Sequence, residues 1–123
     1  MPQALSPDEA CRAVNERLRA AVPPGQSLAE LQARGIRVRT PLRFPPGTLP
    51  AADRASGAAV QGLIAADGSV VPGSPKAIRT IGEPQVADAM EAGALSMNFE
   101  FDHSAQPTQP IPFTTTFAVC TRS

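Results

Sequence analysis

The segment GLIAADGSVVPG, residues 62–73, places an apolar run on each side of the pair Asp67-Gly68. Apolar, partly β-branched runs around an Asp-Gly pair are typical of a β-hairpin. We therefore predict a first strand over residues 58–66, a two-residue type I′ turn at Asp67-Gly68, and a second strand over residues 69–81. This hairpin is the landmark from which the rest of the chain can be placed.

Prolines modify the elements on both sides of the hairpin. Pro72 and Pro75 interrupt the second strand, so we expect that strand to be bent or bulged near its start. Four prolines fall within residues 41–50, and proline cannot donate to a central ladder. We expect that stretch to be extended over the surface of the domain.

Three segments carry helix-start signals. Ser6 and Glu9 form a capping box around Pro7, which predicts a helix to about residue 21, and Ser27 and Glu30 form a second box for a helix ending near residue 34. The run Gly82-Glu83-Pro84 predicts a third helix start. Its apolar face comprises Val86, Ala89, Met90, Gly93, Ala94 and Met97.

The remaining strand signals lie before the hairpin and at the end of the chain. Residues 36–39 form a short alternating stretch, and residues 111–120 form a last strand with Phe113 and Phe117 on one face and Ala118 on the other. The predicted order is helix, helix, extended segment, strand, strand, helix, strand. This order predicts an α+β domain with one small antiparallel three-stranded sheet and extra N-terminal helices packed on it.

Composition excludes several classes of function. The 123 residues carry no net charge, with about +3 on residues 1–61 and −3 on residues 62–123, and they include no Trp and no Tyr. A nucleic-acid-binding protein needs a clustered basic face, so we expect no nucleic-acid partner. No apolar run is long enough to span a membrane, and MPQALSPDEA lacks the features of a signal peptide. We expect the chain to be an excised domain whose signal or anchor lies in a segment outside it.

The two cysteines, Cys11 and Cys120, lie near opposite ends of the chain. They are either two buried thiols or a disulfide that joins the two ends, and the spacing alone leaves both readings open. A disulfide would place the domain in an oxidising compartment. The spacing excludes CxxC redox and zinc motifs.

No catalytic constellation is present in the sequence. The single histidine, His103, lies in the polar run Asp102-His103-Ser104, and neither cysteine has a histidine near it in the sequence. There is no G-x-S-x-G, phosphate-binding loop or H-E-x-x-H motif. We therefore expect no enzyme activity, no cofactor and no metal.

Two surfaces are candidates for binding. Arg37, Arg39 and Arg43 form a basic patch, which we read as a solvated edge in preference to a binding site. The last strand lies at the chain end and is a natural sheet edge, where an extended peptide binds by main-chain hydrogen bonds. We predict that partner binding involves Phe113, Thr114, Thr115, Thr116, Phe117, Ala118 and Val119.

The order of motifs from Leu42 to Val119 resembles the C-terminal domain of TonB proteins. The segments that carry the resemblance are Phe44-Pro45, Gly57-Ala58-Ala59-Val60, Asp67-Gly68-Ser69-Val70, Thr80-Ile81-Gly82-Glu83-Pro84, the helix Val86-Ala87-Asp88-Ala89-Met90-Glu91-Ala92, Phe99-Glu100-Phe101 and Ile111-Pro112-Phe113. The related TolA C-terminal domain shares much of this layout. The run from Asn98 to His103 lacks the basic residues and the proline that the family usually has at the helix exit.

The resemblance implies a β-β-α-β domain over residues 41–123. The helical extension over residues 1–40 is not part of the family's usual domain, and we expect it to form one compact unit with the rest. It implies a periplasmic location and docking by the last strand on a protein or an extended peptide, such as an outer-membrane transporter segment, in transport energised across that membrane. The alternative is a stand-alone envelope accessory or structural protein that reuses the fold. In that case the N-terminal segment would cover the last strand, as a Cys11–Cys120 bridge would favour.

Overall fold

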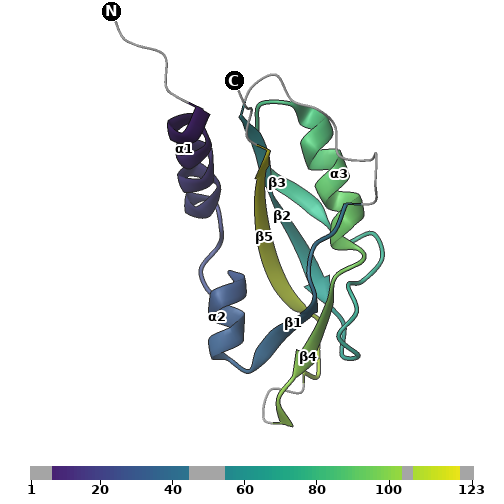
Figure 1. The fold of residues 1–123 in the computed structure, drawn as a ribbon. Coiled ribbons are helices and arrows are strands. Elements are labelled where there is room, and N and C mark those ends of the chain that lie inside the picture. Colours follow the sequence, from purple (N-terminus) through teal and green to yellow (C-terminus); the bar gives the residue numbers. More distant parts are fainter. Residues whose placement is uncertain (1–6, 45–54, 104–106, 120–123) are drawn as a thin grey trace, which may run out of the picture.

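The structure, a computed structural model, describes residues 7–44, 55–103 and 107–119. Its helices and strands confirm the predicted α+β class (Figure 1). In chain order the elements are α1 (Pro7–Ala20), α2 (Leu28–Ala33), β1 (Ile36–Thr40), β2 (Ser56–Ile64), β3 (Lys76–Ile81), α3 (Pro84–Ala94), β4 (Asn98–Phe101) and β5 (Ile111–Val119).

The larger sheet has three antiparallel strands in the order β3-β2-β5. The strand β2 is central because it carries small and β-branched residues that pack on both faces, with Ala58 and Val60 on one and Ala59 on the other. Its pairing with β5 runs without a break from Ser56 opposite Val119 to Ile64 opposite Ile111. The helix α3 follows β3 and begins at Pro84, as predicted.

The hairpin at residues 62–73 is present, but its predicted type I′ turn is wrong. A type I′ turn needs positive φ at both central residues. Here Gly68 has φ +90°, whereas Asp67 does not have a positive φ. Ala65 accepts from the Gly68 N–H at 2.9 Å and donates to the Ser69 carbonyl at 2.8 Å, which makes a three-residue loop. Asp67 instead accepts hydrogen bonds from the Ser69 N–H and hydroxyl.

The second arm of the hairpin is shorter than predicted. Val70 bridges Ile64, and the Val71 N–H donates to the Leu63 carbonyl, but the regular strand β3 begins only at Lys76. The prolines therefore interrupt the arm early, as expected. A register shift against Ala59 and Val60 adds a bulge to β3.

The prediction of a single sheet is wrong, because β1 and β4 form a second, two-stranded antiparallel sheet. Ile36 lies opposite Phe101 and Val38 lies opposite Phe99, so both strands contribute alternating apolar residues. The turn of the hairpin joins this sheet, since the Phe99 N–H donates to the Gly68 carbonyl at 2.8 Å. The four residues of β4 were too few to be recognised as a strand from sequence.

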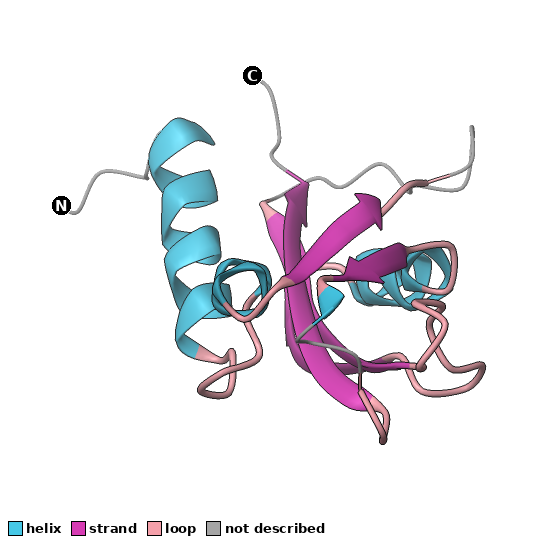
Figure 2. Cartoon of the chain, turned by 90° about the horizontal axis from the view of Figure 1, so that it is seen from below, coloured by secondary structure: helices cyan, strands magenta, loops and turns pink. Residues whose placement is uncertain are grey.

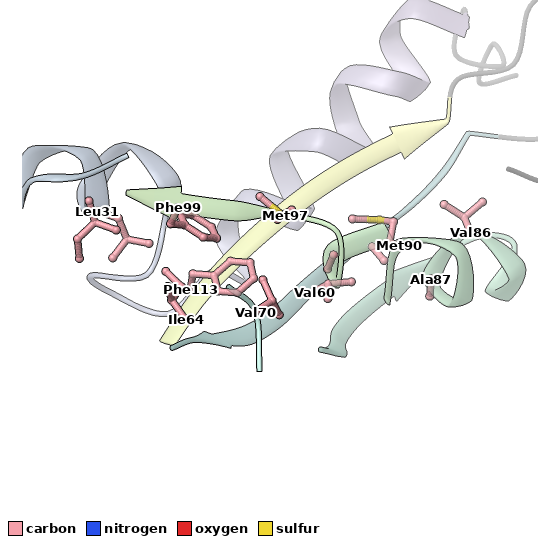
Figure 3. Packing of buried hydrophobic residues seen from close by; sticks show 13 residues of the cluster. Leu31, Val60, Ile64, Val70, Val86, Ala87, Met90, Met97, Phe99 and Phe113 are labelled. Carbon is pink, nitrogen blue, oxygen red and sulfur yellow. The ribbon is translucent and has the colours of Figure 1, made fainter. Parts of the chain in front are cut away.

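The main core lies between the three-stranded sheet, α3 and the small sheet (Figure 2). Phe113 of β5 is fully buried, and its ring lies 5.1 Å from that of Phe99 (Figure 3). Met90 on α3 points toward Val60 of β2, and Val86 belongs to the same buried cluster (Figure 3). Most of the predicted apolar face of α3 is therefore buried, although Ala89 is only half-buried and Ala87, which the prediction left out, is buried.

The opposite face of the sheet is covered by α1 (Figure 2). Val14 and Leu18 pack against Ala59 of β2, with Ala118 of β5 beside them. Gly57 permits this close approach, because a Cβ there would lie 2.5 Å from the Phe117 carbonyl and 2.8 Å from Leu18 Cδ1. The strands β2 and β5 are therefore covered on both faces, by α1 on one and by the main core on the other.

The helical extension over residues 1–40 contacts the rest of the chain throughout its described part. The strand β1 pairs with β4, α1 packs on β2 and β5, and Leu31 of α2 is fully buried in the main core. The surface segment expected at residues 41–50 falls mostly on residues 45–54, which lie outside the described residues.

Candidate protein-binding edge

The side chains of the predicted binding strand are part of the core. Phe113, Thr114 and Thr115 are buried, and the side chains from Thr116 to Val119 are half-buried. Phe117 and Val119 pack against the main core, while Ala118 packs toward α1. The backbone edge of β5 and the exposed parts of the side chains from Thr116 to Val119 therefore remain for a partner.

Backbone groups of β5 alternate between the β2 side and the outer side. The Thr114 N–H donates outward, to the Gln26 carbonyl at 2.8 Å. Because the pairing with β2 has no register shift, the alternation carries Thr116 and Ala118 to the same outer side and Phe113, Thr115 and Phe117 to the β2 side. Pro112 also falls on the outer side, where its missing N–H breaks no ladder bond.

The segment before α2 pairs with this outer edge at one position. Ser27 and Thr114 form an isolated parallel bridge. The Gln26 Oε1 atom also accepts from the Thr114 hydroxyl at 3.0 Å and from the Gln61 Nε2 atom at 2.7 Å. The capping box located the start of α2 but carried no signal for this pairing, which depends on tertiary placement.

Beyond Thr114 the outer edge is unpaired within the described part of the chain. No strand over residues 7–44, 55–103 or 107–119 lies outside β5, and no backbone group there bonds the outward positions at Thr116 and Ala118. The edge carries no charged side chain over its nine residues. An uncharged edge with an unbroken ladder behind it is a ready template for another strand.

The opposite edge of the sheet, β3, is protected. Its six residues include Lys76 and Arg79, both exposed, and its ladder with β2 contains the bulge. The Ala77 N–H donates to the Glu91 Oε2 atom of α3 at 2.7 Å. Short length, basic residues and a bulge are features that discourage edge pairing.

The arginines of the predicted basic patch lie on β1, at Arg37 and Arg39, and in the segment after it, at Arg43. Arg37 donates to Asp102 across 3.3 Å and lies opposite Glu100 on β4. Arg39 is exposed farther along β1, and the Arg43 backbone lies against Gly93 of α3. Because the Arg37 and Asp102 side chains are about half exposed, their pair contributes at most about 1 kcal/mol.

The predicted disulfide involves one residue that lies outside the described residues, Cys120. Cys11 lies on α1, where its Sγ atom accepts from the Asn15 Nδ2 atom at 3.7 Å. The helix α1 packs on β5, whose last residue, Val119, directly precedes Cys120. This packing is compatible with the bridge, which stays a prediction.

Two exposed carboxylates have lowered pKa values. The hydrogen bond from the Ser27 hydroxyl, at 2.9 Å, and that from the Gly25 N–H, at 2.8 Å, lower the pKa of Glu30. The hydroxyl and the N–H of Ser69 lower the pKa of Asp67. Each carboxylate accepts hydrogen bonds within a turn, Glu30 in the turn before α2 and Asp67 in the hairpin turn.

Other side chains give no alternative site in the described residues. His103 is exposed, and no three His, Cys, Asp or Glu residues lie close enough together there to hold a metal ion. None of the described helices is long and apolar enough to cross a membrane. Comparison of the chain with protein-family models, curated proteins and solved structures finds no match.

Proposed function

We propose that this chain is a protein-binding domain of the bacterial cell envelope. It binds an extended segment of a partner protein by backbone pairing at the outer edge of β5, beyond Thr114. The partner strand would use the N–H and C=O groups of Thr116 and Ala118, with specificity supplied by side chains that rest on α1 and on the residues near Phe117.

The observation that carries this proposal is the pairing of Thr114 with Gln26 and Ser27. It is a short stretch of added strand on the same edge, with one backbone hydrogen bond of 2.8 Å. The unbroken ladder with β2, the absence of charge and the contrast with the protected β3 edge support the same conclusion.

The resemblance to TonB C-terminal domains supports the choice of partner and compartment. The order strand, strand, helix and last strand along the chain is compatible with that layout, with β4 inserted before β5. We therefore propose a periplasmic location and, as partner, a short segment of an outer-membrane transporter or of another envelope protein.

An NMR titration tests the proposal. Addition of a synthetic peptide that copies the short periplasmic segment of an outer-membrane transporter should shift the amide signals of Thr116 and Ala118. In Thr116→Pro, which removes one outward donor, the shift of the Ala118 amide signal should be much smaller at the same peptide concentration. A panel of such peptides that leaves both signals unchanged at millimolar concentration would contradict the proposal.

A second candidate function is that of a stand-alone envelope accessory or structural protein whose N-terminal segment covers the edge. The Gln26–Thr114 pairing favours it, as does the packing of α1 on β5. Non-reducing mass spectrometry of the native protein would show whether Cys11 and Cys120 are bridged. Slow hydrogen exchange at Thr116 and Ala118 in the free protein would favour this candidate over an open edge.

A further inference from the structure

The hydrogen bonds between the loop before α2 and the sheet are concentrated on one residue, Gln26. Its backbone carbonyl accepts from the Thr114 N–H, and its Oε1 atom accepts from the Thr114 hydroxyl and from the Gln61 Nε2 atom. The side chain of Thr114 is only 2% exposed, so its hydroxyl depends on this acceptor. Gln26 therefore holds the segment on the edge at Thr114, beside the part of the edge that stays unpaired among the described residues.

The loop that carries Gln26 keeps its shape through bonds of its own. The Gly25 N–H donates to the Glu30 Oε2 atom at 2.8 Å, and the Arg34 Nη1 atom donates to the Gly25 carbonyl at 3.3 Å. Ser27 caps α2 by accepting from the Glu30 N–H. The loop and α2 thus form a local unit, anchored in the core by the fully buried Leu31, that would survive the loss of the Gln26 bonds.

We infer that Gln26 and Ser27 act as a built-in competitor for the partner strand. This inference rests on the proposed function of the β5 edge. The open part of the edge, residues 115–119, is about 17 Å long at the usual rise per residue and offers only two outward positions. A partner that also pairs with Thr114 must displace Gln26. Partners long enough to reach Thr114 therefore bind with a lower affinity than their contacts alone would give.

The regulation follows from linked equilibria. A long partner binds only the form of the protein in which Gln26 has left Thr114. The apparent affinity for a long partner is therefore the intrinsic affinity multiplied by the fraction of molecules in that form. A short partner that ends before Thr114 does not pay this penalty. Loosening Gln26 should therefore raise the affinity for long partners alone.

The test uses two peptides and two variants of the full chain. The peptides are a nine-residue transporter segment and its five-residue truncation, and the variants are Gln26→Ala and Gln26→Glu. Gln26→Ala removes the Oε1 acceptor, whereas Gln26→Glu keeps an acceptor for both donors. Affinities are read from the amide shifts of Thr116 and Ala118.

We expect Gln26→Ala to bind the nine-residue peptide about tenfold more tightly than the wild type, and Gln26→Glu to remain within about twofold of it. The five-residue peptide should bind all three proteins alike. Should Gln26→Ala fail to fold, Gln61→Leu loses only one of the three bonds and should give a smaller increase, of about threefold.

The outcomes separate this inference from the proposed function. Equal gains for both peptides, or no gain in Gln26→Ala, would overturn the competitor while leaving β5 as the binding edge. Absence of binding by either peptide to any variant would overturn the proposed function itself, and the competitor with it.

Discussion

The two edges of the three-stranded sheet differ in almost every feature that governs strand pairing. The β3 edge is six residues long, bulged, basic at Lys76 and Arg79, and has the Ala77 N–H bonded to Glu91. The β5 edge is nine residues long, free of bulges and uncharged, and it already pairs with Gln26 and Ser27 at Thr114. One edge has the features that prevent pairing, and the other has those that allow it.

This difference shows that side chains and backbone have separate roles in β5. Its side chains complete the core on one face and pack under α1 on the other. Its outward backbone groups are then the part left for a partner. In β3 the side chains are largely exposed, and a helix residue closes part of the backbone edge. The following predictions test this separation.

The largest expected effect is on the core role of β5. Phe113→Ala should lower the free energy of unfolding by about 3–5 kcal/mol, because the ring is fully buried against Phe99. Ile78→Ala on β3, a side chain that is 40% exposed, should cost less than about 1 kcal/mol. Denaturant unfolding of both variants measures the contrast, and similar losses would show that the two strands contribute alike.

A pair of proline substitutions separates the two sides of the β5 backbone. Thr115→Pro removes an N–H directed to β2 and leaves a carbonyl of that strand without a donor, so it should cost about 2–4 kcal/mol. Thr116→Pro removes an outward N–H and should change stability by no more than about 1 kcal/mol. Urea titrations give both values, and the reverse order would mean that the alternation along β5 has been assigned incorrectly.

The closure of the β3 edge can be removed at Glu91. Glu91→Ala takes away the acceptor of the Ala77 N–H and should cost about 1–2 kcal/mol, with faster hydrogen exchange at Ala77. Glu91→Gln keeps an oxygen acceptor and serves as the matched control. Unchanged exchange at Ala77 in Glu91→Ala would show that this bond does not protect the edge.

The smallest effect is that of acid on the turns beside each edge. The lowered pKa values of Glu30 and Asp67 stabilise the folded state fully above the ordinary carboxyl pKa of about 4, and this contribution is lost as the pH falls through the lowered values. Glu30→Gln and Asp67→Asn should therefore each flatten the pH dependence of stability on the acidic side. Thermal melts between pH 2 and pH 6 measure the slopes, and slopes equal to the wild type would contradict this origin.

The sequence predicted the parts of the fold that have local signals. The capping box at Ser27, the start of α3 at Pro84 and the alternation of Phe113 and Phe117 all act over a few residues, and the structure confirms them. The β1–β4 sheet was missed because it joins short segments far apart in the chain. The turn type was wrong because Asp67 bonds to Ser69 rather than adopting a positive φ.

Of the candidate site, the sequence predicted the strand β5 but not which of its backbone groups face outward or what they contact. Its uncharged, threonine-rich sequence indicated an edge, but its outward direction and its contact with Gln26 depend on the position of α2 relative to β5. The sequence separation between Gln26 and Thr114 is 88 residues, and no local pattern reports on such a pair. The protection of β3 by Glu91 is likewise a tertiary contact.

The most direct test of β5 as the binding edge is backbone hydrogen exchange, measured at both edges of the sheet in the free protein and again with the transporter peptide bound. We expect the outward amides of Thr116 and Ala118 to exchange quickly in the free protein and to slow at least tenfold when the peptide is bound. The Thr80 amide on the outer side of β3 should not change. Protection of Thr80 instead, or of neither edge, would contradict the claim that β5 is the binding edge.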